Sequence, residues 1–552
     1  MTGCDEDRYR SFFQQLTAHA PFDYQVQVAR CLLEGKSIVL RAPTGAGKTW
    51  AVLAPFLFSG WHRRPVRLIY ALPLRTLAQG VYREAREAAS RLGLPVEGQE
   101  DARGYERVSP FVTLQTGEQP DDRFFDRGRI IVTTYDQLLS GLLDGPYGLS
   151  DRLHNVNAAA VAGALVVFDE FHLMEPHRAF LTAVACLHLF RDLCQSVWMT
   201  ATATQPLEQV LTEGLQTVSV PAPGGETNAL LDALPSVTQV TRRMVVEGEP
   251  LSADAVLRCH TGRSLVLLNT VGRAQAMYEE LRKSLEEKGT NMPLLLLHSR
   301  FFKEDRHVKE EQLRSLFGKG ATGPAILVAT QVVEAGLDLS CEHLHTELCP
   351  MNALVQRAGR CARFAGEAGT VHVYALPSEE RAWLPYGTPQ GEHVTLSKTR
   401  ELLARIGTDT LHPHRTAAWV QEVHGADDAL ALREGWGARL RKCVGLIEQN
   451  AILRAHARVA DLIRGEETDS LRVIISEATR LPDSPGRREG VNLSRRSLSR
   501  LLRNGNQGVG WYWDGADEEP WKPLQESADL NKTYVVCLQP AVAAYDRDVG
   551  LR

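Results

Sequence analysis

Two adjacent carboxylates close a strand-like run of the sequence. The apolar segment "ALVVF" (164–168) ends at Asp169 and Glu170. An unpaired charge at the end of a buried strand is unfavourable, so these acids should face a polar partner. One carboxylate of such a pair can hold Mg²⁺, usually through water, while the other orients or deprotonates an attacking water. We predict these roles for Asp169 and Glu170, respectively; the plainer alternative is an acidic N-terminal pair of a helix.

A glycine-rich segment, "VLRAPTGAGKTW" (39–50), follows another strand-like run and precedes a helical pattern. Its backbone N–H groups can turn towards a phosphate chain, and Lys48 can reach the β and γ phosphates. Ala42 stands where the general pattern has its first glycine, and a plain glycine turn is the alternative interpretation. The ATP-binding residues predicted in the loop are Thr44, Gly45, Ala46, Gly47, Lys48 and Thr49, with Thr49 and Asp169 holding Mg²⁺.

These segments need a parallel sheet to position them. Strand-like runs alternate with helical patterns twice along the chain, which predicts two α/β units with parallel sheets. The first unit has runs at 37–42, 66–73, 111–116, 129–135, 164–170 and 196–202. The second has runs at 264–270, 293–299, 325–330, 343–348 and 370–377. We expect an N-terminal helical segment (1–21), a first lobe (22–220), a connector (221–250), a second lobe (251–380) and a mostly helical accessory domain (381–552) with one terminal strand (533–540).

The composition fits a soluble globular protein. Hydrophobic residues make up 44% of the 552-residue chain and charged residues 23%, and no apolar run is long enough to span a bilayer. Ten cysteines without a C-x-x-C pair are typical of reduced thiols. The net charge of −5 requires any nucleic acid to bind at local basic surfaces. We therefore expect a cytoplasmic monomer that does not contact membranes.

The order of motifs resembles that of superfamily-2 helicases. The segments that carry the resemblance are "APFDYQ" (20–25), the glycine-rich loop, "ALPLRTLAQ" (71–79), "VTTYDQLL" (132–139), the Asp-Glu-x-His segment, "MTATAT" (199–204), "VATQVVEAGLDL" (328–339) and "LVQRAGRCAR" (354–363). The resemblance implies two RecA-like lobes, of which neither alone closes the nucleotide site. It also implies that Arg360 and Arg363 reach the γ phosphate from the opposite lobe as arginine fingers, for which the guanidinium fork is suited.

The resemblance assigns further residues. Gln25 is the expected adenine reader, and Gly336 and Asp338 are expected to bind ATP. His172, Thr200 and Thr202 are expected to couple hydrolysis to lobe movement, with His172 facing the lobe interface near Gln356. The residues expected to act in catalysis are Lys48, Asp169, Glu170, Gln356, Arg360 and Arg363.

Within this superfamily the chain is most similar to the CRISPR-associated helicase of type I interference systems. The similarity rests on "VVEAGLDL", "QRAGRCAR", "DEFHLM" and "LLHSRFFKEDR" (296–306), and it covers roughly residues 12–378. It is looser beyond, although "LQPAVAAYDRDVGL" (538–551) is similar to the end of the family's accessory domain. The resemblance implies an ATP-dependent single-stranded DNA translocase, moving 3′→5′, that a guide-RNA surveillance complex recruits to an R-loop.

Many members of that family carry a metal-dependent nuclease with an adjacent His-Asp pair. No His-Asp dipeptide occurs in this sequence. We therefore expect no nuclease activity in this chain, and a His-Asp nuclease partner that is a separate protein or a missing C-terminal domain.

Contacts to the nucleic-acid backbone are less clearly marked. Leu74 stands in "ALPLRTLAQ" where a threonine is frequent, which leaves Arg75 or Thr76 as the phosphate contact. Hydroxyls near strand ends can also hold phosphate without reading bases. The further contacts expected on this ground are Thr116, Thr270 and Thr330. The arginine-rich stretch 486–506 could bind a backbone or form a solvated face, and "GWYWDG" (510–515) could stack bases or pack in a core.

Two other function classes stay open. The first is a superfamily-2 RNA helicase, or a DNA translocase outside CRISPR interference. The second is a nucleotide-gated nucleic-acid-binding scaffold without useful hydrolysis, against which Lys48, Glu170 and Arg363 argue because they are the groups that hydrolysis needs.

Overall fold

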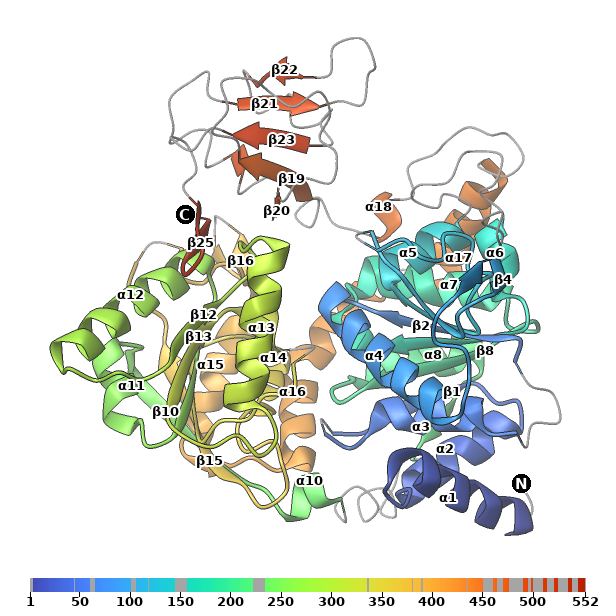
Figure 1. Cartoon of the computed structure of the whole chain (residues 1–552), viewed down its shortest axis with the longest axis horizontal. Helices are drawn as coiled ribbons and strands as arrows, with labels where there is room; N and C mark the ends of the chain where they lie inside the picture. The colour runs from blue at the N-terminus through green and yellow to red at the C-terminus, as the bar shows by residue number, and fades with distance from the viewer. Residues whose placement is uncertain are drawn as a thin grey trace.

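The structure is a computed structural model of the chain. It describes residues 3–43, 45–59, 65–100, 106–117, 119–143, 156–221, 234–334, 337–379, 381–388, 391–433, 435–449, 460–463, 470–475, 490–494, 498–499, 510–513, 521–524, 535–538 and 545–551. Figure 1 shows two α/β lobes side by side, with a smaller sheet from the C-terminal part of the chain beyond them.

The first lobe is built on a seven-stranded sheet in the order β5-β6-β2-β7-β8-β1-β9, in which every neighbouring pair is parallel. Most of its strands are buried along their length, which explains their near-continuous apolar character. The strands are β1 (Ile38–Arg41), β2 (Arg67–Leu72), β5 (Val112–Gln115), β6 (Ile130–Thr134), β7 (Ala164–Asp169), β8 (Gln195–Thr200) and β9 (Val218–Val220). A separate short hairpin pairs β3 (Gln99–Glu100) with β4 (Glu106–Val108).

Helices cover this sheet on both faces, as the two apolar clusters on its opposite sides indicate. The N-terminal helix α1 packs on the lobe through Tyr9, Phe13 and Leu16. The helices are α1 (Gly3–Thr17), α2 (Asp23–Leu33), α3 (Lys48–Leu57), α4 (Arg75–Arg91), α5 (Tyr135–Leu142), α6 (Val156–Val161), α7 (Leu181–Leu189) and α8 (Gln205–Leu215), with short turns η2 (Phe171–Leu173) and η3 (Pro176–Phe180).

The second lobe has a seven-stranded sheet in the order β12-β13-β11-β14-β15-β10-β18, parallel except for the edge strand β18. Its strands are β10 (Thr241–Pro250), β11 (Arg263–Leu267), β12 (Leu294–Leu297), β13 (Ala325–Ala329), β14 (His343–Glu347), β15 (Ala368–Ala375) and β18 (Asp409–Thr410). The short helix α10 (Pro235–Thr238) precedes this lobe and packs on the core of the first through Val237. The helical segments of the second lobe are α11 (Ala253–Cys259), α12 (Val271–Glu287), α13 (Lys303–Phe317), η4 (Gln331–Val333) and α14 (Met351–Ala358), and a short hairpin pairs β16 (Gly387–Thr388) with β17 (Gly391–Glu392).

Three helices after the second lobe connect it back to the first. Helices α15 (Val394–Ile406) and α16 (Pro413–Ala431) contribute apolar side chains to the core of the second lobe. Helix α17 (Gly435–Ile447) packs against α7, and the short α18 (Ala460–Ile463) also joins the core of the first lobe. The chain therefore crosses between the lobes a second time, through α16 and α17.

The remaining described strands form a five-stranded sheet in the order β20-β19-β23-β21-β22. They are β19 (Ser470–Ile475), β20 (Val491–Ser494), β21 (Gly510–Trp513), β22 (Lys522–Pro523) and β23 (Val535–Leu538). A last hairpin, β24 (Tyr545–Asp546) and β25 (Gly550–Leu551), lies against the second lobe, near the C label in Figure 1.

The predicted fold class is confirmed, and every strand expected in the two lobes is present. The second lobe begins earlier than expected: residues 241–250, assigned to the connector, form β10 and pair with β15. The accessory region is helical over α15–α17, but its later described strands form a sheet where one strand was expected. None of the described helices combines the length and the apolar character that crossing a membrane requires.

Candidate active site

The phosphate loop joins the end of β1 to the start of α3. Gly45 and Gly47 both have φ of 80°, a left-handed backbone that glycine adopts without strain. A Cβ atom at Gly47 would lie 2.9 Å from Nε2 of Gln25, so both the conformation and the space favour glycine there. Helix α3 begins at Lys48, and Lys48 and Thr49 of its first turn line the cleft between the lobes. Thr44 lies outside the described residues.

Lys48 lies on the floor of this cleft and is almost fully buried. Its Nζ donates to the carbonyl oxygen of Ala42 at 3.1 Å and lies 3.6 Å from Oε1 of Glu170. The ammonium therefore already neutralises part of the charge of the carboxylate pair, at the position where it is expected to meet phosphate.

Gln25 lies beneath the phosphate loop. Its Nε2 donates to the carbonyl oxygen of Gly47 at 3.0 Å, and its Oε1 accepts from the N–H of Phe22 at 2.9 Å. The side chain is 2% exposed, so both ends of the amide are occupied inside the protein. Its role as adenine reader stays a prediction, and it requires Gln25 to exchange one of these partners.

Asp169 ends β7 and is the buried member of the carboxylate pair. Tyr70 donates its hydroxyl to Oδ2 of Asp169 at 2.8 Å and also contacts Thr49. Among the described residues, Oδ1 of Asp169 is buried and has no hydrogen-bond partner. A buried, unsatisfied carboxylate oxygen beside a hydroxyl is a donor set that suits Mg²⁺. Burial and the neighbouring Glu170 raise the pKa of Asp169, which a cation bound there would oppose.

Glu170 follows in a left-handed conformation, with φ of 56°. This turn directs its carboxylate away from the strand, towards Lys48 and the cleft. Burial raises the pKa of Glu170, but Lys48, His172 and Arg360 outweigh it, and the net shift is downward. Glu170 is therefore ionised at neutral pH and can accept a proton or a hydrogen bond from a water molecule, while Asp169 beside it is shifted in the opposite direction.

His172 connects the two lobes. Its Nδ1 lies 2.6 Å from Oγ1 of Thr200, and its Nε2 contacts Nε2 of Gln356 on α14 of the second lobe. The expected proximity of His172 to Gln356 is confirmed. Burial lowers the pKa of His172 to about 4, so its ring is neutral at pH 7. Thr202 donates its N–H to the Thr200 hydroxyl at 2.9 Å, which extends the chain of contacts into the segment after β8.

The two arginines expected as fingers, Arg360 and Arg363, both come from the turn after α14. Arg360 donates to the carbonyl oxygens of Val333 at 3.0 Å and Glu334 at 2.6 Å, and its Nη1 is buried without a partner among the described residues. Arg363 donates to Oδ1 of Asp338 at 2.5 Å. Arg360 is the arginine whose charge acts on Glu170 from the opposite lobe. Gly336 lies outside the described residues.

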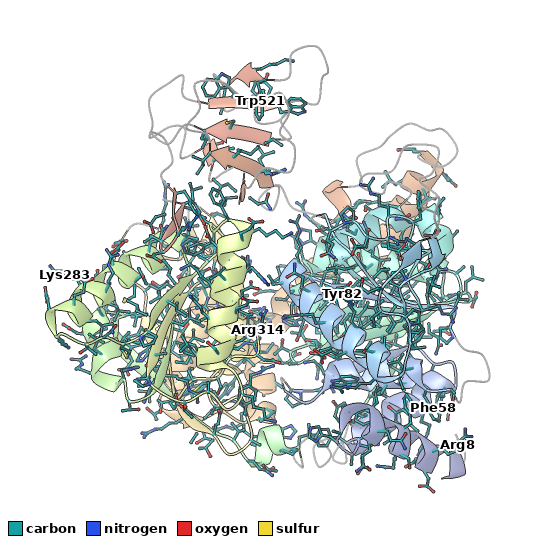
Figure 2. The ribbon with its side chains drawn as sticks, in the orientation of Figure 1. Arg8, Phe58, Tyr82, Lys283, Arg314 and Trp521 are labelled. Carbon is teal, nitrogen blue, oxygen red and sulfur yellow. The ribbon has the colours of Figure 1, made fainter. Side chains whose placement is uncertain are left out.

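A cleft of about 700 Å³ brings these groups together. Side chains of both lobes fill the space around it in Figure 2, where Arg314 is labelled on α13 and Tyr82 on α4. Motif residues in its lining are Gly45, Gly47, Lys48, Thr49, Asp169, Glu170, Asp338, Gln356, Arg360 and Arg363. The sequence interpretation missed Glu84, Arg314 and Lys319, which also line it and lie on helices or turns without a motif. Burial and the charge of Asp338 raise the pKa of Glu84 to about 7.

A second groove, of about 430 Å³, runs between the lobes at α4 and α13. Arg75 and Thr76 line it from the first lobe, as expected for strand contacts. The lining also contains the acids Asp136 and Glu310. Further lining residues that the sequence interpretation missed include Gly117, Gln137, Ser299, Lys303, Arg306 and Asn492. Ser299, Lys303 and Arg306 lie in the segment 296–306. The similarity of that segment to the helicase family was the sequence signal that could have indicated them.

The other three threonines expected to contact nucleic acid do not line this groove. Thr116 is buried and accepts from the N–H of Gln119 at 3.1 Å, Thr270 caps α12 by accepting from the N–H of Arg273 at 3.4 Å, and Thr330 is 3% exposed. Their roles stay predictions.

The basic and aromatic stretches of the C-terminal region lie only partly within the described residues. Arg487, Arg488, Arg495, Arg496, Arg500 and Arg503 fall outside them. Trp511 and Trp513 lie on β21, and Trp513 packs edge-on against Trp521 with ring centroids 5.6 Å apart. This contact favours packing over base stacking for Trp513.

Two protein families match the chain. DEAD/DEAH box helicases match residues 22–210, and the family described as CRISPR-associated nuclease/helicase Cas3, C-terminal, matches residues 260–366. CRISPR-associated helicase Cas3 of Thermoproteus tenax is 28% identical over 383 residues, which cover 67% of this chain and 59% of the relative. CRISPR-associated endonuclease/helicase Cas3 of Thermus thermophilus is 27% identical over 521 residues, which cover 76% of this chain and 53% of the relative. The first lobe thus matches a helicase family, and the two lobes together are similar to those of CRISPR-associated superfamily-2 helicases.

Solved structures agree with this helicase fold. The crystal structure of T. fusca Cas3 with AMPPNP has a TM-score of 0.68 at 19% identity and covers 98% of this chain and 72% of that one. A chain of a structure described as a CRISPR RNA-guided surveillance complex, pre-nicking, has a TM-score of 0.59 at 18% identity and covers 96% of this chain and 70% of that one. The chain spans little more than half the length of the two curated relatives.

Proposed function

We propose that this chain is an ATP-dependent translocase that moves along single-stranded DNA. The observation that carries the proposal is the contact between His172 and Gln356 beside the cleft. It links the carboxylate pair of the first lobe to α14, the helix that directly precedes the turn holding Arg360. Lys48 and Glu170 face the cleft from one side, and Arg360 and Arg363 from the other.

This arrangement supports hydrolysis that depends on lobe closure. Lys48 binds the phosphates, and the Asp169 and Thr49 oxygens hold Mg²⁺, which supplies charge neutralisation when bound. Glu170 accepts the proton of the attacking water, and Arg360 stabilises the negative charge that develops on the γ phosphate. Because the two sets of groups lie on different lobes, turnover requires the lobes to be together and product release lets them separate.

The second groove is the proposed path of the single-stranded DNA. Arg75 and Thr76 on one lobe and Ser299, Lys303 and Arg306 on the other offer cations and hydroxyls, which hold a phosphate backbone without reading its bases. Opening and closing of the ATP cleft would change the distance between the two halves of this groove. If each lobe holds the DNA strand in turn, this change in distance moves the strand along the groove.

We further propose that the translocase works in type I CRISPR interference, with 3′→5′ polarity. A guide-RNA surveillance complex would recruit it to the displaced strand of an R-loop, and a His-Asp nuclease from elsewhere would cut that strand. Support comes from the relatives named as CRISPR-associated helicases and from the fold shared with a chain of a surveillance-complex structure. No His-Asp dipeptide occurs in this sequence, so the proposed nuclease would be a separate protein or a further domain outside these residues.

ATP turnover with and without single-stranded DNA tests the proposal. The wild-type protein should turn over ATP faster with an oligothymidylate, and Lys48→Ala should abolish turnover in both conditions. Lys36→Ala is a matched control. Lys36 is an exposed lysine just before β1, the strand that leads into the phosphate loop, and it pairs with Glu34 at 2.8 Å. It should behave as the wild type.

The same assay separates the alternatives. Stimulation by single-stranded RNA alone would overturn the DNA proposal in favour of an RNA helicase. Nucleotide binding without turnover under any condition would indicate a nucleotide-gated scaffold. Full turnover in Lys48→Ala would contradict the assignment of the phosphate loop.

A further inference from the structure

The C-terminal hairpin β24–β25 is bound to one short segment of the second lobe, residues 298–302. The Leu551 N–H donates to the carbonyl oxygen of Arg300 at 2.8 Å, and the Phe302 N–H donates to the Tyr545 hydroxyl at 2.9 Å. The rings of Phe302 and Tyr545 stack with centroids 3.7 Å apart. Backbone and side chains of the hairpin therefore fix this segment at two points.

His298 is the third point of attachment. Its Nδ1 accepts from the Arg300 N–H at 3.1 Å, so its Nε2 carries the proton and donates to the carbonyl oxygen of Val549 at 2.9 Å. The ring is fully buried, and burial lowers the pKa of His298 to about 4, which keeps it neutral and in this tautomer. His298 also stacks on Phe301 with ring centroids 4.5 Å apart.

Gly550 makes this close approach possible. Its φ is 77°, and a Cβ atom there would lie 2.6 Å from Cε1 of His298 and 2.7 Å from the carbonyl oxygen of Arg300. A side chain at this position would push the hairpin away from residues 298–300, because one of the two opposing atoms belongs to the backbone.

The hairpin also joins two cores. Val549 is buried in the core of the second lobe with Phe301, whereas Leu551 is buried in the core of the five-stranded sheet, against which Phe302 packs. Val549 and Leu551 of the hairpin, like Phe301 and Phe302 of the segment, thus belong to different cores. Neither can shift without disturbing the other.

The side of residues 298–302 that faces the second groove is the part proposed to bind DNA. Ser299, Phe301 and Lys303 line the second groove, and they alternate with the residues that the hairpin holds. We propose that the hairpin is a positioning element for nucleic-acid binding: it fixes residues 298–302 so that Ser299, Phe301 and Lys303 present their groove-facing atoms to the strand. This inference rests on the proposed function of the groove.

Two variants of the full chain test the inference. Gly550→Ala should displace the hairpin, and Tyr545→Phe keeps the ring stack but removes the hydroxyl that accepts from Phe302. Gly289→Ala is the matched control, because Gly289 also has a positive φ, of 62°, and a Cβ atom there meets nothing within 4 Å. The measurements are binding of a fluorescein-labelled oligothymidylate, its concentration for half-maximal ATPase stimulation, and KM for ATP.

Both hairpin variants should need at least about fivefold more oligothymidylate for half-maximal stimulation, a typical size for coupling between sites. Basal turnover and KM for ATP should stay at wild-type values, which a general loss of folded protein would not allow. If Gly550→Ala also lowers basal turnover, the oligothymidylate dependence of Tyr545→Phe alone tests the inference. Wild-type oligothymidylate dependence in both variants would overturn the inference. A wild-type protein that neither binds nor responds to DNA would instead overturn the proposed function, and this inference with it.

Discussion

Thr204 donates its hydroxyl hydrogen to Oδ2 of Asp428 at 2.6 Å, although the two residues are 224 positions apart. Thr204 caps α8 of the first lobe, directly after the Thr200–Thr202 segment that contacts His172. Asp428 lies on α16, whose Trp419 and Val423 are buried in the core of the second lobe. The hydrogen bond therefore connects the predicted coupling segment to the second lobe at a point outside the ATP cleft.

We predict that Asp428→Ala weakens the response of ATP turnover to DNA. A hydrogen bond to a charged group contributes about 1.5–3 kcal/mol, so stimulation by DNA should fall by about tenfold or more while basal turnover persists. Asp428→Asn is the conservative control, since its amide oxygen still accepts from Thr204. The double variant Thr204→Val with Asp428→Ala should be no worse than Asp428→Ala alone. Additive losses would mean that the two residues act independently.

Glu170→Gln should separate ATP binding from hydrolysis. The amide keeps the size of the carboxylate but cannot take a proton, so turnover should fall by about 10²–10⁴-fold. Binding of a fluorescent ATP analogue should persist, because Lys48 and the phosphate loop are unchanged. Glu175→Gln is a control on an exposed glutamate of the same segment, which pairs with His177 at 3.0 Å. Persistent turnover in Glu170→Gln would show that another group is the base.

The sequence was sufficient to predict both sheets and the main residues of the ATP cleft. Buried parallel strands leave near-continuous apolar runs, and the residues predicted to act in catalysis stand where such runs end, as Asp169 ends β7. The contact of His172 with Gln356 could also be predicted, because both residues belong to motifs that fall at the lobe interface.

Other features left no such pattern. β10 is half-exposed and polar, "TRRMVVEGEP", so its pairing with β15 became visible only in the structure. Glu84, Arg314 and Lys319 reach the cleft because two helices from different lobes face each other, which is a tertiary relationship without local spacing. The Thr204–Asp428 bond and the hairpin contacts of His298 join residues more than 200 positions apart and left no signal in either segment.

Asp169→Asn should raise the Mg²⁺ concentration that turnover requires. The amide removes the negative charge while retaining one oxygen beside Thr49, so half-maximal activity should shift to higher Mg²⁺ rather than disappear at saturation. Chelation of Mg²⁺ with EDTA should abolish turnover in the wild type. Tyr70→Phe, which removes only the hydroxyl donated to Asp169, should shift the Mg²⁺ dependence less. An unchanged Mg²⁺ dependence in Asp169→Asn would exclude Asp169 as a metal-holding residue.

Histidines stack on one face of the second sheet and should make this lobe sensitive to acid. The rings of His345 and His372 are 4.9 Å apart, and His343 lies 5.9 Å from His372. Burial lowers the pKa of His343 and, more strongly, that of His345, and the neighbouring histidines lower both further. The acidic groups that face the stack are Glu247, whose Oε1 is 2.9 Å from Nδ1 of His372, and Glu342, which opposes the shift at His343.

The sign of the effect follows from proton binding. An unfolded histidine titrates near pH 6.5, and the pKa values of His343 and His345 are lower in the folded protein, so below about pH 6.5 the unfolded chain binds more protons. The free energy of unfolding should then fall by about 1.4 kcal/mol per pH unit for each such histidine until its folded pKa is reached. Hydrogen exchange at the amides of β14 and β15 should accordingly be faster, relative to the intrinsic rate, at about pH 5.5 than at about pH 7.5. His345→Phe keeps an aromatic ring in the stack and should make this pH dependence shallower. An equal dependence in the variant would show that His345 is not among the groups responsible.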